Sequence, residues 1–140
     1  MKNIMLLVLT CCVLSLTFGV SAEELSAQRA QVLKQTGIPI YPASTYVNGT
    51  TGDITSFRFA SSDNVKKVRD WYRKKFPEWA LTTEYGSWIL YNGKSGGGPA
   101  EYMSKHQILI MENKNLQQWF GLPASMTTEV IISLPMTMTE

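Results

Sequence analysis

The stretch that decides the fold is 61-SSDNVKKVRDWYRKKFP-77, and it predicts an amphipathic helix over Asp63–Phe76. Four apolar side chains recur at helical spacing on one side of this helix, and basic side chains cover the other. Ser61 or Ser62 can cap the first turn, and Pro77 prevents the helix from continuing. We therefore expect one main helix that buries its apolar side against a sheet.

Strand patterns flank this helix on both sides. Upstream, Ile38–Val47 and Ile54–Ala60 are separated by the turn residues 48–53, which predicts a β-hairpin. Downstream, residues 79–91 predict either one long strand broken at Gly86 or two strands around a tight turn. After a glycine-rich loop over residues 92–105, two more strands are expected, at His106–Glu112 and Thr127–Leu134.

Two further helices complete the prediction. Glu23–Thr36 is expected to be an amphipathic helix that ends at Gly37. Asn115–Phe120 is expected to be a short helix, and we interpret the apolar segment Trp119–Leu122 as a lid over the sheet edge. This order predicts an α+β domain with a mostly antiparallel sheet of about four to six strands. The main helix packs on one face, and the N-terminal helix is added to it.

The first residues have the layout of a secretory signal peptide. Met1–Ala22 combines a positive charge at Lys2, a nearly continuous apolar run and small residues at its end. We expect cleavage after Ala22 and a single periplasmic or secreted domain over residues 23–140, without a transmembrane segment. Cys11 offers an alternative lipoprotein site, but the bulky residues before it disfavour lipidation.

Composition excludes several classes of chemistry. The chain has thirteen basic and eleven acidic residues, so removal of Lys2 leaves twelve against eleven, which argues against a dedicated nucleic-acid binder. Both cysteines leave with the signal peptide, and His106 is the single histidine, so we expect no metal, no cofactor and no cysteine nucleophile. The sequence has no G-x-S-x-G motif, and we assign no catalytic residue.

A series of packing motifs runs through residues 38–92. Tyr41-Pro42-Ala43 forms a Tyr-Pro-x-Ala entry, and a predicted hairpin follows it. A helix capped by serine and aspartate comes next, with the core Val68-Arg69-Asp70-Trp71-Tyr72, and Trp79 opens the next strand. In these motifs the chain resembles a group of small exported bacterial proteins and lipoproteins without an assigned function. The resemblance implies the α+β fold and export, and it carries no site residues.

The main helix is the first candidate binding surface. Six of its residues are basic, which is half of the positive charge left after cleavage. Such a surface can attract an anionic membrane or an acidic polymer, or it can be a solvated outer face that keeps the helix soluble. The candidate binding residues on this helix are Lys66, Lys67, Arg69, Arg73 and Lys74.

The segment 92-NGKSGGGP-99 is the second candidate. It is not a phosphate-binding loop, because Trp88 stands where that motif needs its first glycine. The remaining interpretations are a hairpin tip and a recognition loop. In the second case Tyr91, Lys94 and Tyr102 contribute to binding.

We therefore expect an exported binding module without enzymatic activity, whose partner is a macromolecule such as an envelope protein. The alternative is a protein that binds an anionic membrane surface or an acidic polymer through residues 66–75. A hydrolase that works through two carboxylates is a third hypothesis.

Overall fold

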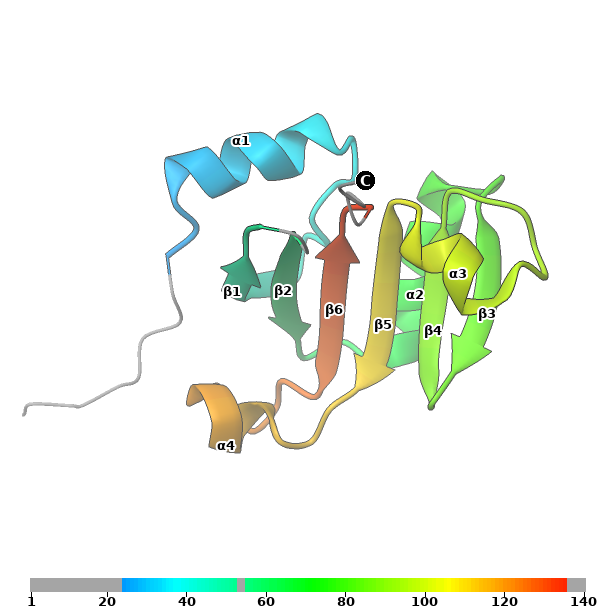
Figure 1. Cartoon of the computed structure of the whole chain (residues 1–140). Helices are drawn as coiled ribbons and strands as arrows, with labels where there is room; N and C mark the ends of the chain where they lie inside the picture. The colour runs from blue at the N-terminus through cyan, green and yellow to red at the C-terminus, as the bar shows by residue number, and fades with distance from the viewer. Residues whose placement is uncertain (1–23, 53–54, 136–140) are drawn as a thin grey trace, which may run out of the picture.

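The computed structural model describes residues 24–52 and 55–135, and within these ranges it contains six strands and four helices (Figure 1). The predicted α+β class and antiparallel sheet are confirmed. The predicted signal peptide, Met1–Ala22, lies outside the described residues. In the part of the chain that the structure describes, no helix is long and apolar enough to cross a membrane.

The elements follow the chain in this order: α1 Ala27–Gln35, β1 Ser44–Thr50, β2 Ser56–Ser61, α2 Val65–Lys75, β3 Ala80–Glu84, β4 Ser87–Tyr91, α3 Gly98–Met103, β5 Gln107–Glu112, α4 Leu116–Phe120 and β6 Thr128–Ser133. The strands form one sheet in the order β1-β2-β6-β5-β4-β3, and each neighbouring pair is antiparallel. The sheet therefore combines a hairpin, β1–β2, with a meander, β3 to β6. The last strand, β6, lies between β2 and β5 and joins these two units.

The main core lies between the sheet and the two longer helices. Successive strand residues point to opposite faces, so alternate residues of each strand face α1 and α2. In Figure 1, α2 lies behind the sheet, and α1 crosses above the end of β1 and β2. The buried apolar residues of this core are Leu33, Ile38, Tyr41, Phe57, Phe59, Val68, Tyr72, Leu90, Ile108, Ile110, Val130 and Ile132.

Two smaller clusters cover the other face of the sheet. Leu116 and Leu122, from the segment around α4, pack on Val47 and Ala60, so this segment acts as the predicted lid. Trp119 departs from that interpretation, because 59% of it is exposed. The third cluster joins α3 to β3, β4 and β5, and its members are Ala80, Ile89, Tyr91, Tyr102 and Leu109.

The start of α2 differs from the prediction. The helix begins at Val65, and its N-cap is Asn64, whose Oδ1 accepts a hydrogen bond from the Lys67 backbone N at 2.9 Å. Ser61 lies before the helix, where its hydroxyl donates to the Ala43 carbonyl at 2.6 Å and accepts from the Asp63 backbone N at 3.1 Å. The chain therefore enters the helix about two residues later than the serines suggested.

The glycine-rich loop also differs, because it contains the helix α3. Pro99 lies in the first turn of this helix, where a missing backbone N–H costs nothing, and good helix formers follow it. Residues 79–91 form the two-strand alternative, with β3 and β4 joined at Tyr85 and Gly86. Both turn residues have positive φ, 48° and 77°, which suits the tight hairpin turns that match strand twist.

Candidate functional site

The five predicted binding residues of the main helix all belong to α2, and ion pairs hold three of them. Four lie on its exposed side, whereas Arg69 packs over Trp88 of the sheet. Lys66 Nζ lies 2.6 Å from Asp70 Oδ2, and Lys67 Nζ lies 2.8 Å from Asp63 Oδ1. The hydrogen bonds from these lysines lower the pKa of each carboxyl, helped by Tyr41 at Asp63 and by Arg69 at Asp70. The carboxylates therefore stay ionised and keep the lysine side chains extended along the helix surface.

The arginines of α2 are fixed by different contacts. The Arg69 guanidinium lies over the Trp88 ring, 4.5 Å from its centre, and 2.7 Å from Asp70 Oδ1. Arg73 donates a hydrogen bond to the backbone carbonyl of Trp79. Both arginines thus connect α2 to its neighbours, whereas Lys74 points into solvent and has no ion pair within the described ranges.

A shallow hollow of about 450 Å³ runs beside these lysines. Its inner wall includes Tyr41, whose hydroxyl donates to Asp63 Oδ2 at 2.6 Å. Burial and this hydrogen bond raise the pKa of Tyr41 to about 12, so the phenol stays protonated as a donor. The full lining is Tyr41, Asn64, Lys66, Lys67, Asp70, Trp71 and Lys74.

The other three predicted residues lie away from α2. Tyr91 and Tyr102 pack together on the opposite face of the sheet, with ring centres 6.0 Å apart. Tyr91 is only 1% exposed, and its hydroxyl donates to the Lys94 carbonyl at 2.7 Å. Tyr102 donates to the Glu84 carboxylate, and this bond with burial raises its pKa to about 12. The two predicted surfaces are therefore separate, and Tyr91 is a core residue.

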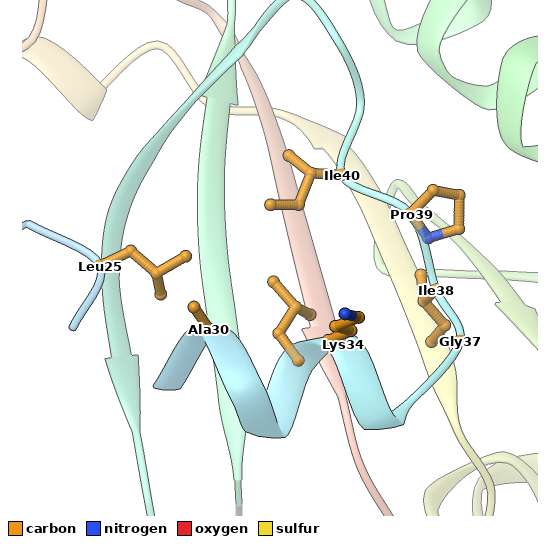
Figure 2. A pocket seen from close by; sticks show the side chains of 8 residues that line it. Leu25, Ala30, Lys34, Gly37, Ile38, Pro39 and Ile40 are labelled. Atoms are coloured by element: carbon orange, nitrogen blue, oxygen red, sulfur yellow. The ribbon is translucent and has the colours of Figure 1, made fainter. Parts of the chain in front are cut away.

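A second hollow, which no sequence pattern predicts, lies beside α1 and has a volume of about 320 Å³ (Figure 2). Its lining is apolar except for one lysine. The apolar pair Ile38 and Ile40 on either side of Pro39 was visible in the sequence. The position of that pair against α1 depends on how the chain turns after the helix.

The sequence does not predict the ion pair on the sheet face that carries α4, in which a buried carboxylate meets a partly exposed arginine. Glu129 of β6 is 2% exposed, and its Oε1 lies 2.5 Å from Arg58 Nε. Its Oε2 accepts a hydrogen bond from Asn113 Nδ2 at 2.9 Å. The Arg58 guanidinium also lies over the Phe120 ring, 5.1 Å from its centre. This cluster ties the lid segment to the sheet.

Within residues 24–52 and 55–135, no group of three or more histidine, cysteine, aspartate or glutamate side chains is arranged to hold a metal ion. The fold and these surfaces define a small α+β protein with one antiparallel sheet and a cationic helix on one face. No family model matches the chain, and no curated protein or solved structure matches it either.

Proposed function

We propose that this chain is an exported, non-enzymatic binding module that recognises an anionic macromolecule through the outer side of α2. The observation that carries the proposal is the surplus of positive charge on this one helix. Residues 63–75 contain six basic and two acidic side chains. A concentrated charge of one sign attracts an oppositely charged partner and accelerates its association.

The contacts along α2 support binding over mere solvation. Two lysines are held by ion pairs at 2.6 and 2.8 Å, and Arg69 is held over the Trp88 ring. Side chains that are already ordered lose less conformational entropy when a partner binds. The hollow next to Lys74 gives an extended anionic chain a place to lie.

The carboxylates near this surface do not favour the hydrolase alternative. A general acid at neutral pH needs a raised pKa, and here the lysine hydrogen bonds lower the pKa of Asp63 and of Asp70. Both carboxylates instead form ion pairs with basic side chains of α2. A binding function therefore agrees better with their electrostatic surroundings.

A membrane surface remains the rival partner. The apolar side of α2 is buried against the sheet, so α2 has no apolar side to insert into a bilayer. Contact with lipid would rest on charge, at about 1 kcal/mol for each lysine near the surface. We therefore favour an acidic polymer or an acidic protein surface as the partner.

Binding of the purified protein to polyglutamate, measured by titration calorimetry, tests the proposal. We expect affinity to fall as salt rises from about 0.05 M to about 0.5 M, because salt screens exposed charges. Binding to vesicles with and without phosphatidylglycerol, measured in the same way, tests the alternative that the partner is an anionic membrane. Stronger binding to the anionic vesicles than to polyglutamate would favour the rival partner.

The matched variants are Lys74→Glu and Lys114→Glu, which change the net charge equally. Lys114 is exposed and lies outside α2, between β5 and α4. We expect Lys74→Glu to weaken polyglutamate binding about fivefold to tenfold, and Lys114→Glu to leave it within about twofold. Binding that ignores salt, or an equal loss in both variants, would contradict the proposal.

A further inference from the structure

The hollow beside α1 lies between that helix and the chain segment that follows it. Figure 2 shows Leu25 at one end, the Gly37–Pro39 segment at the other, and Ile40 facing the helix across the gap. Its volume of about 320 Å³ is near the lower limit for small-molecule sites. The residues that line it are Leu25, Ala30, Leu33, Lys34, Gly37, Ile38, Pro39 and Ile40.

The two walls of this hollow are α1 and the segment that follows it, and local hydrogen bonds fix the turn between them. Gly37 has a φ of 71°, the left-handed conformation that ends helices, and it turns the chain back along α1. Thr36 fixes the turn, because its hydroxyl donates to the Leu33 carbonyl at 2.6 Å and accepts from the Ile38 backbone N at 3.0 Å. The hollow therefore exists before any ligand arrives.

Apart from Lys34, the lining is apolar from its floor to its rim. Leu33 and Ile38 form the floor and are 3% and 4% exposed. Ile40 stands at the rim and is 40% exposed, one of four large hydrophobic side chains that are exposed within the described residues. An alkyl chain that covers such a surface removes apolar area from water, which favours binding.

Lys34 is the one charged residue of the lining. It lies in the last turn of α1, and in the described residues it forms no ion pair with a carboxylate. A cation next to an apolar hollow matches a ligand that has an apolar body and one negative charge.

We propose that this hollow binds one fatty acid, with its alkyl chain against Leu25, Ile38 and Ile40 and its carboxylate on Lys34. The size and charge of the hollow point to this ligand. A volume of about 320 Å³, near the lower limit for small-molecule sites, favours one alkyl chain over the two chains of a phospholipid. One lysine balances a carboxylate, whereas a neutral hydrocarbon would leave its charge unused.

This site is separate from the α2 surface, so the polyglutamate variants and the fatty-acid variants test different residues.

The experiment is a titration of the purified protein with dodecanoate below its micelle concentration, with the heat of binding measured by calorimetry. Dodecanol is the matched ligand, because it has the same chain without the negative charge. We expect saturable binding of one dodecanoate per protein, tighter than that of dodecanol.

Three variants separate the roles of charge and space. Lys34→Met keeps the length of the side chain and removes the charge, so it should weaken dodecanoate about fivefold and leave dodecanol unchanged. Ala30→Phe fills the hollow and should weaken both ligands. Ile40→Ser alters an exposed residue, so it tests the apolar rim even if Ala30→Phe fails to fold. Lys105→Met is the control for loss of one positive charge elsewhere.

The proposal is wrong if dodecanoate does not saturate, or if Lys34→Met weakens both ligands equally. It is also wrong if Ile40→Ser and Ala30→Phe, both folded by circular dichroism, bind dodecanoate as the natural sequence does. Sedimentation supplies one more outcome. A dimer that Ile40→Ser dissociates would assign the hollow to a second copy of the chain.

Discussion

At the scale of single residues, the most consequential contact is that between Glu129 and Arg58. A carboxylate that is 98% removed from solvent needs a counter-charge, and Arg58 Nε at 2.5 Å provides it. Asn113 satisfies the second carboxylate oxygen at 2.9 Å. Because Asn113 follows β5 and Arg58 belongs to β2, one carboxylate connects three parts of the fold.

The consequence is testable by unfolding in urea. Arg58→Met leaves the Glu129 charge buried without its partner, so we expect a loss of about 3 kcal/mol in the free energy of unfolding. The double change Arg58→Met with Glu129→Leu should cost less than Arg58→Met alone. Lys114→Met breaks the exposed pair with Glu112 and should cost less than about 0.5 kcal/mol. A double variant less stable than Arg58→Met would contradict this account.

At the scale of elements, the cap of α2 sets where the helix begins. Asn64 accepts a hydrogen bond from the Lys67 backbone N, so Asn64→Ala leaves a helix-terminal N–H without its partner. We expect a loss of about 1 kcal/mol, with Asn64→Ser retaining most of the stability. Ser62 is exposed and does not cap the helix, so Ser62→Ala is the control and should change stability by less than about 0.5 kcal/mol. If Asn64→Ala and Ser62→Ala lowered the free energy of unfolding equally, Asn64 would not be the main N-cap of α2.

Elements with a strong local pattern could be predicted, and those set by distant contacts could not. The apolar arc of α2 and the turn residues between β1 and β2 are local, so the sequence indicates the helix and the hairpin directly. The predicted first strand, Ile38–Val47, is misplaced, because β1 is Ser44–Thr50. Ser61 does not cap α2, because its hydroxyl donates to the Ala43 carbonyl, a contact that only the folded hairpin creates, and accepts from the Asp63 backbone N ahead of the helix. The helix α3 was missed because Gly96, Gly97 and Gly98 dominate its start.

The candidate site also has parts that a local sequence pattern predicts and parts that depend on distant contacts. Lys66, Lys67 and Lys74 lie on the outer side of α2 as helical periodicity predicts, because the apolar side must face the sheet. Arg69 instead packs over Trp88 of β4, and its side chain is 24% exposed. Tyr91 belongs to a strand in which Ile89, Leu90 and Tyr91 are all buried, since both faces of β4 are covered. The hollow beside α1 depends on the turn at Gly37 and the path of the segment after it. No single stretch of sequence contains that information.

At the scale of the whole molecule, β6 decides whether the sheet is one unit. It pairs with β2 on one side and β5 on the other, so it joins a hairpin from the start of the domain to a meander that follows α2. Both pairings involve the last strand in the sequence, because every other strand precedes β6. We therefore expect unfolding to be cooperative across the whole sheet, with tryptophan fluorescence and far-ultraviolet circular dichroism giving the same transition.

Two adjacent isoleucines of β6 test this role with matched chemistry. Ile132 is fully buried in the main core opposite Phe57 and Ile108, whereas Ile131 points to the other face and is partly exposed. We expect Ile132→Ala to cost about 3 kcal/mol in urea unfolding, because it leaves a cavity between two strands. Ile131→Ala should cost about 1 kcal/mol, since it loses less buried area. Both probes should shift together in both variants. If Ile132→Ala separated the fluorescence and circular dichroism transitions, the hairpin and the meander would be independent units and β6 would not join them.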